Sequence, residues 1–236
     1  MLRKVLIAMA VVLTVILYCG LAAAEKVNVG DVITFGHYEQ DNDLNNGPEP
    51  IRWTVLEVDE QNNKALIMCL NTLDAIPYHS SKEDITWEKS FLRQWMNSTF
   101  LDNAFSAEEQ SAIVETLVKN SREQGHPAVS TSGGEDTTDK IFALSYAEAR
   151  YYPISSGLPT EFSIARGVLI DSFVETVTDQ NQTCWWLRSP GSDPAHAFLM
   201  DAGSRLVINM NVATNSVGVC PVLWLSLQSE PISTGE

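Results

Sequence analysis

The chain has 236 residues, with 15 Lys and Arg against 30 Asp and Glu, so its formal net charge is −15. Nucleic acids and anionic lipids are bound through cationic faces, so this charge argues against both as partners. Hydrophobic residues make up 44% and charged residues 19% of the chain, a composition that folds rather than stays disordered. The length suits one large domain or two small ones.

The first residues have the pattern of an export signal. Arg3 and Lys4 precede an uncharged, mostly apolar stretch, and an A-x-A cleavage site ends at Ala24. We therefore expect a signal peptide over residues 1–24. An uncleaved anchor is the alternative, because the chain carries no charge from Val5 to Ala24 and this stretch just reaches the length of a membrane span. In both cases the rest of the chain is expected outside the cytoplasm, secreted or at the cell surface.

Three cysteines follow the expected signal peptide: Cys69, Cys184 and Cys220. Disulfides persist in an oxidising compartment, so an exported chain can pair two of them. Cys184 and Cys220 both lie in strand-like segments near the carboxyl end, and we expect them to form a disulfide. Cys69 lies in an apolar stretch and is expected to be a buried thiol. Three buried thiols without any bridge remain the alternative, because spacing does not reveal connectivity.

The amino-terminal part reads as an antiparallel meander. A turn followed by a strand is expected over residues 29–36, and strands are expected over residues 51–58 and 65–70. Trp53 and Val55 alternate with polar residues, as in a half-buried strand. A polar turn separates the last two strands, and a long exposed loop over residues 40–48 separates the first two.

Helices are expected in the middle of the chain. Trp87, Phe91 and Trp95 recur at a spacing of four, which predicts a helix over residues 87–100 with Thr86 as its N-cap. Two capping-box pairs, Ser106 with Glu109 and Ser145 with Glu148, predict the starts of two further helices. A Gly/Ser/Thr-rich loop is expected over residues 130–139, a short strand over 141–144 and a short helix over 161–171.

The carboxyl-terminal part returns to strands, which are expected over residues 184–188, 197–201, 205–208 and 217–227. The middle two strands flank a turn at Gly203 and form a hairpin. Strands at both ends with short helices between them predict one α+β domain over residues 25–228, with antiparallel sheets and termini that meet in one sheet. Residues 229–236 are expected to form a flexible tail.

Two stretches near the carboxyl end, residues 184–191 (CWWLRSPG) and 219–225 (VCPVLWL), resemble a bacterial family of exported proteins catalogued as domain of unknown function 6273. Weaker matches cover residues 30–36, 46–53, 86–97 and 133–145. The resemblance implies a single C-type-lectin-like domain, related also to the formylglycine-generating enzymes, and it implies no known activity. The family usually carries Arg where this chain has Cys220, so a bridge to Cys184 would take over the structural role of that Arg.

One loop has a spacing that suggests calcium. Asp41, Asp43 and Asn45 alternate like the first ligands of a calcium loop, but Gly47 and Arg52 stand at the wrong places for an EF-hand. We therefore expect this segment to form either an irregular calcium site or a solvated acidic loop held by Asx turns. We expect no cofactor, with calcium as the one open possibility.

Adjacent Trp185 and Trp186 face opposite sides of their strand. We expect Trp185 in the core and Trp186 as an exposed platform for a sugar ring or a peptide, because Arg188 lies on the same face as Trp186 and supplies hydrogen-bond donors. Core packing of both rings is the alternative. The following hairpin and its flanks would complete the same ligand-binding surface, with His196, Asp201, Asn209 and Asn211.

No complete catalytic motif is present. The histidines lack the spacing of a metal site, and no Gly-rich phosphate loop occurs. The sequence therefore favours an exported, non-enzymatic domain that binds an extracellular glycan, peptide or surface protein. One alternative is a thiol-dependent oxidoreductase of the formylglycine-generating type that uses Cys184 and Cys220, and the other is a structural module of the cell envelope.

Overall fold

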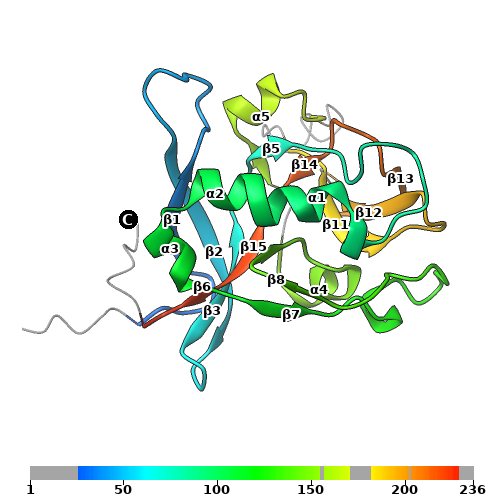
Figure 1. Ribbon diagram of the computed structural model, residues 1–236, viewed down its shortest axis with the longest axis horizontal. Coiled ribbons are helices and arrows are strands. Elements are labelled where there is room, and N and C mark those ends of the chain that lie inside the picture. Colours follow the sequence, from blue (N-terminus) through cyan, green and yellow to red (C-terminus); the bar gives the residue numbers. More distant parts are fainter. Residues whose placement is uncertain (1–25, 155–156, 171–181, 202, 229–236) are drawn as a thin grey trace, which may run out of the picture.

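A computed structural model describes residues 26–154, 157–170, 182–201 and 203–228. The fold is α+β, as expected, with mostly antiparallel sheets and a few short helices (Figure 1). The expected signal peptide and tail lie outside the described residues. Within the described part of the chain, no helix is both long and apolar enough to cross a membrane.

The larger sheet confirms the predicted meander. Its strands run in the order β1-β2-β3-β15-β6, every neighbouring pair is antiparallel, and β9 also pairs with β15. The last strand of the chain therefore lies beside the amino-terminal meander, as predicted. The bounds are β1 Val32–Tyr38, β2 Glu49–Asp59, β3 Lys64–Cys69, β6 Ile113–Val114, β9 Ile141–Phe142 and β15 Val222–Ser226.

A second sheet has the strand order β13-β12-β11-β14-β5, in which β11 and β14 run parallel. The single strand expected over residues 217–227 is wrong, because its two halves belong to different sheets. Pro221 has no N–H to donate to a ladder, and the chain passes from one sheet to the other at this point. The bounds are β5 Asp74–Ala75, β11 Trp185–Pro190, β12 His196–Met200, β13 Leu206–Asn211 and β14 Gly218–Val219.

Two small ribbons complete the strands. β4 (Asn71–Thr72) pairs in parallel with β10 (Leu158–Pro159), and β7 (Thr116–Val118) pairs antiparallel with β8 (Thr137–Asp139). The long connection between β7 and β8 extends to one end of the molecule (Figure 1).

The helix predicted over residues 87–100 is broken after one turn. Ser90 is extended and caps α1, because its hydroxyl accepts the Arg93 N–H, whereas the Thr86 side chain makes no capping bond. The apolar stripe is thus shared among several short helices. Their bounds are η1 Trp87–Lys89, α1 Phe91–Trp95, the π-helical η2 Met96–Phe100 and α2 Leu101–Ala104.

Both capping boxes are confirmed. Ser106 and Glu109 open α3 (Ala107–Ala112), and Ser145 and Glu148 open α4 (Tyr146–Tyr151). The helix expected over residues 161–171 is shorter, since α5 (Glu161–Ala165) ends just before Gly167 at φ +91°. One more turn of helix, η3 (Arg122–Gln124), lies between β7 and β8.

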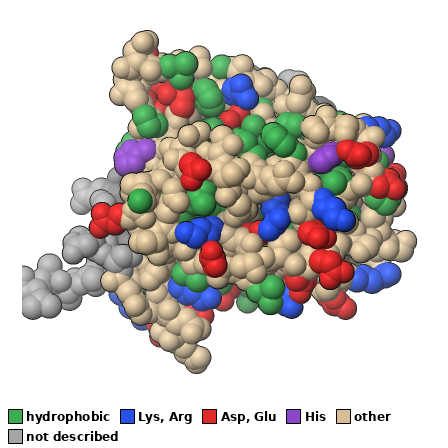
Figure 2. Space-filling view, viewed as in Figure 1, with side chains coloured by type: hydrophobic (Ala, Val, Ile, Leu, Met, Phe, Trp, Pro, Cys, Tyr) green, Lys and Arg blue, Asp and Glu red, His purple; other side chains and the backbone are tan. Residues whose placement is uncertain are grey.

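One cluster of buried side chains extends from Val27 to Leu225. Between the larger sheet and the helices, the Phe105 ring lies 5.2 Å from Phe35 and 6.3 Å from Trp53. A Cβ on Gly36 would come within 2.4 Å of the Phe105 ring, and its φ of +69° also favours glycine. On the outer surface acidic and basic side chains are interspersed, with no large field of one sign on the face shown (Figure 2).

Candidate binding site

The expected tryptophan platform is wrong, because both rings are buried. Trp185 is 0% and Trp186 1% exposed, and every residue of β11 is buried. The Trp186 Nε1 donates to the Ile76 carbonyl at 2.8 Å, and its ring meets Tyr78 edge to face. Alternation along the strand separates the two rings onto opposite faces, but both faces of this strand are covered.

Arg188 is also unavailable to a ligand, contrary to expectation. Its guanidinium is 2% exposed and forms a two-pronged ion pair with Glu148. The Ala143 carbonyl accepts from Nη1 at 2.8 Å, and the Lys119 carbonyl accepts from Nη2 at 3.0 Å and from Nε at 3.4 Å. A guanidinium has five N–H donors, and these bonds use all five.

The hairpin residues divide into two groups. Asp201 is buried, and its carboxylate accepts both the backbone N–H and Nε of Arg205, so it fixes the turn rather than a ligand. His196 and Asn211 are half-buried and opposite each other, and Asn209 is exposed. His196 Nδ1 lies 2.7 Å from Asp193. Of the six ligand-binding residues expected from the sequence, only these three remain at the surface.

The carboxyl-terminal end of the buried strand β11 supports a long loop, residues 119–136, between β7 and β8. Connections longer than about 12–15 residues without strands or long helices of their own are uncommon and often functional. The two ends of this loop are close together, since Val118 pairs with Thr137 and the Asp136 carboxylate binds both the Asn120 N–H and the Lys119 ammonium. It is therefore a closed loop that projects from a two-stranded base.

Side chains of β11 hold this loop in place. The Ser189 hydroxyl donates to the Gln124 carbonyl at 2.9 Å, beside the bonds from Arg188 to the Lys119 carbonyl. The hydroxyl that caps α4, on Ser145, donates to the Gln124 side chain at 2.9 Å. A Cβ on Gly133 would meet the backbone oxygen of Asn120 at 2.3 Å, so the two limbs of the loop touch.

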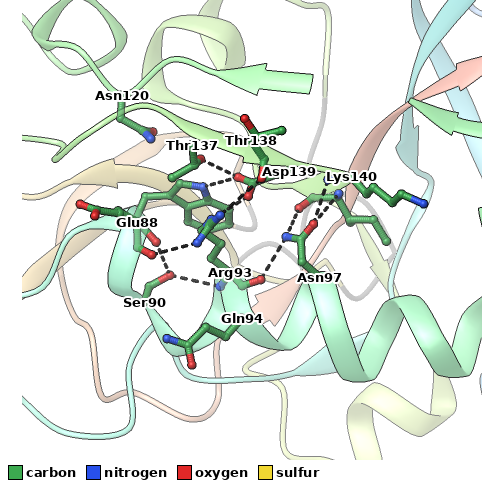
Figure 3. Close-up of polar contacts among 12 residues, drawn as sticks. Glu88, Ser90, Arg93, Gln94, Asn97, Asn120, Thr137, Thr138, Asp139 and Lys140 are labelled. Carbon is green, nitrogen blue, oxygen red and sulfur yellow. Dashed lines mark hydrogen bonds and ion pairs between the residues drawn. The ribbon is translucent and has the colours of Figure 1, made fainter. Parts of the chain in front are cut away.

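A second buried network anchors the other limb (Figure 3). The Asp139 carboxylate, fully shielded from solvent, accepts from Arg93 Nε at 2.6 Å, from Trp87 Nε1 at 3.0 Å and from the Thr137 hydroxyl at 2.7 Å. Figure 3 also shows Asn97, whose amide oxygen accepts two backbone N–H bonds, one of them from Lys140. The base of the loop is thus fixed against the α1 region by an ion pair whose carboxylate is buried.

A pocket lies between this loop and the end of β11. Its cavity volume is about 10 Å³, which is room for about one water molecule. Its lining comprises Asn120, Ser121, Arg122, Gln124, Gly125, Val129, Thr131, Gly133, Arg188, Ser189 and Pro190. Sequence reasoning missed the loop side chains of this pocket. The available signal was the lack of any apolar period over residues 119–136.

The cysteine pairing expected from the sequence is not present. Among the described residues the structure contains no disulfide. Trp185 pairs in parallel with Gly218, so Cys220 lies about 10 Å further along the sheet than the position opposite Cys184, at about 3.3 Å per residue. A disulfide needs Cα atoms within about 7 Å. The Cys220 Sγ instead lies 3.5 Å from the Thr72 hydroxyl.

The acidic loop has a different geometry from the predicted calcium loop. Asp41 accepts from the Asp43 N–H and from the Asn46 amide, and Asp43 accepts from Asn45, as in Asx turns. The polar groups of Asp43 and Asn45 therefore form hydrogen bonds with each other inside the loop. The carboxylates that do approach one another, within 4.8 Å, are Glu39, Asp41 and Glu49. Calcium binding stays a prediction.

A family model described as Domain of unknown function (DUF6273) matches residues 62–227, which include β3 and every later element. No curated protein and no solved structure matches the chain.

Proposed function

The chain belongs to the DUF6273 family, and from this premise we propose that it is an exported, non-enzymatic domain that binds an extracellular glycan, peptide or surface protein through the loop 119–136 and its pocket. The export pattern of residues 1–24 supports a place outside the cytoplasm. We also propose that its α+β fold is C-type-lectin-like. Strands from both ends of the chain share one sheet, with short helices between them, which supports this assignment.

One observation carries the proposal: a long polar loop is held in place by two ion pairs, each of which has one buried member. Arg188 with Glu148 holds one limb, and Arg93 with Asp139 holds the other. A loop fixed before it meets a ligand loses less conformational entropy on binding, so its polar groups bind more tightly. Buried charges cost free energy to desolvate, and a domain that needed only stability would gain as much from apolar residues.

The state of the thiols argues against the oxidoreductase alternative. A reactive cysteine needs an accessible thiolate and therefore a lowered pKa. Cys220 is 1% exposed, and burial raises the pKa of its thiol to about 12. Burial also raises the pKa of Cys69. Both thiols are protonated at neutral pH, which supports a binding role over thiol chemistry.

The test uses the purified chain on glycan and peptide arrays, with calcium and with chelator. Ser121→Trp places a large ring at the exposed mouth of the pocket, and Ser111→Trp, on the exposed surface of α3, is the matched control. We expect one class of ligands to bind the native chain and the control, and to be lost from Ser121→Trp. Equal binding by all three proteins, or no ligand on either array, would contradict the proposal.

A further inference from the structure

Asn46 and Gly47 form the only Asn-Gly pair in the sequence of the chain. They lie in the acidic loop, residues 40–48, which projects from the larger sheet between β1 and β2 (Figure 1). Both residues are exposed. A Cβ built on Gly47, whose φ is +88°, would have no heavy atom of the surrounding chain within 4 Å. Other segments therefore do not crowd this dipeptide.

The backbone nitrogen of Gly47 is available for reaction. Among the described residues it donates no hydrogen bond. The side chain of Asn46 is held only through its amide nitrogen, which donates to Asp41 Oδ2 at 2.7 Å. A backbone nitrogen that follows an asparagine can close a ring with the amide carbon Cγ of that asparagine. Glycine leaves this attack unhindered, because it has no side chain.

We infer that Asn46 is a site of spontaneous deamidation. The Gly47 nitrogen bonds to Cγ of Asn46, the bond from Cγ to Nδ2 breaks, and ammonia leaves with the proton of the Gly47 N–H. One water molecule then opens the cyclic imide at either of its carbonyl groups, which gives aspartate or isoaspartate at position 46. The reaction consumes water, releases ammonia and transfers no electrons. Asparagine is among the thermolabile residues for this reason.

The product adds a negative charge where carboxylates already gather. Glu39, Asp41 and Glu49 have carboxylate oxygens within 4.8 Å of one another. Asn46 donates a hydrogen bond to Asp41, whereas a carboxylate at position 46 can only accept one. Deamidation thus replaces an attraction with a repulsion between like charges. We expect the acidic loop to open when Asn46 is converted.

Asn62 is a matched internal control. It is exposed in the turn between β2 and β3, and its amide nitrogen also donates to an aspartate, Asp59 Oδ2, at 2.7 Å. The residue that follows it is Asn63, so the attacking nitrogen carries a substituted carbon. The two asparagines therefore differ mainly in whether glycine comes next.

The experiment incubates the purified chain and a synthetic peptide of residues 40–50 in the same mildly alkaline buffer. Peptide mass mapping follows the conversion of each asparagine over time. In the folded chain we expect Asn46 to be converted at least about tenfold faster than Asn62, because glycine leaves the nitrogen unhindered. Asn46→Gln should stay unmodified, since its longer side chain closes the ring far more slowly.

Two results would overturn the site: equal rates at Asn46 and Asn62, or an intact Asn46 in the folded chain after the peptide has been converted. Hydrogen exchange tests the expected opening. Asn46→Asp should accelerate the exchange of the amides of residues 40–47, with no change in β11 and β12. Unaltered exchange of this loop in Asn46→Asp would overturn the opening.

Discussion

The guanidinium of Arg188 and the carboxylate of Glu148 form a two-pronged ion pair, and Arg188 is 2% exposed. Glu148 also accepts the Ser145 N–H as the third residue of the α4 capping box. The Glu148 carboxylate thus joins the start of α4 to β11. Through Arg188 it also joins α4 to the loop 119–136.

Glu148→Gln tests this pair. A glutamine still serves a capping box, so the substitution removes the charge and leaves Arg188 uncompensated. We expect a loss of about 3 kcal/mol or more in the free energy of unfolding, measured by urea denaturation. Glu109→Gln is the control at the other capping box, which has no buried arginine, and should cost only about 1 kcal/mol, because the amide keeps one of the two bonds that Glu109 accepts from the Ser106 and Gly36 N–H groups. Equal effects of the two substitutions would show that the ion pair is not critical.

The two tryptophans of β11 are both expected to be essential for folding. Trp185→Ala and Trp186→Ala should each cost about 3–5 kcal/mol, since both rings are buried. The Trp→Phe variants distinguish the hydrogen bonding of the two indole nitrogens. Trp186→Phe loses the bond to the Ile76 carbonyl, whereas Trp185 Nε1 has no partner in the described part of the chain. Trp186→Phe should therefore be the less stable by about 1 kcal/mol, and native-like stability of either alanine variant would contradict the burial.

The buried thiols of Cys69 and Cys220 should be inert in the folded chain. Because burial raises the pKa of Cys220 to about 12, iodoacetamide at pH 8 should leave this residue unmodified until a denaturant is added. Peptide mass mapping reads out each cysteine separately. The intact mass should be the same with and without reductant, since the structure has no disulfide in its described residues. Rapid alkylation of native Cys220 would favour the oxidoreductase alternative instead.

The raised pKa of Glu39, at the acidic loop, predicts that the stability of the folded chain depends on pH. Burial, together with the neighbouring Glu49 and Asp41, raises the pKa of its carboxyl above 4.5. The folded state then holds this proton more tightly than the unfolded state does, so stability falls as pH rises from about 4.5 through the raised pKa. Glu39→Gln removes the penalty. Its melting temperature should exceed that of the native chain at pH 7, and the gain should shrink toward pH 4.

Glu60→Gln is the control of opposite sign, because a hydrogen bond from Lys26 lowers the pKa of Glu60. That substitution should give no gain at pH 7. Calorimetric scans at both pH values decide the matter, and a lower melting temperature for Glu39→Gln at pH 7 would refute the assignment.

Local patterns in the sequence predicted the elements well where neighbouring residues determine them. Alternation placed β2, and the two Ser-x-x-Glu spacings placed the starts of α3 and α4. Local patterns failed where packing against distant segments determines the structure. The break at Ser90 and the change of sheet at Pro221 both depend on what the chain packs against.

The site was harder to predict for the same reason. Alternation predicts that Trp186 and Arg188 share a face, but it reveals neither the shift of register between Trp186 and Pro190 nor the burial of both side chains. The partner of Arg188 lies 40 residues away at Glu148, and no local spacing connects them. The pocket depends on two networks that meet at one loop, so only the folded chain reveals it.

Hydrogen exchange of the loop 119–136, in the native chain and in Glu148→Gln, reports whether the ion pair of Arg188 and Glu148 holds this loop in place. We expect slow exchange of these amides in the native chain, as in a loop fixed before binding. We also expect a marked acceleration in Glu148→Gln, with no change in β2 and β3. Exchange at the unprotected rate in the native chain, or an unaltered loop in the variant, would contradict a binding surface held in place by Arg188.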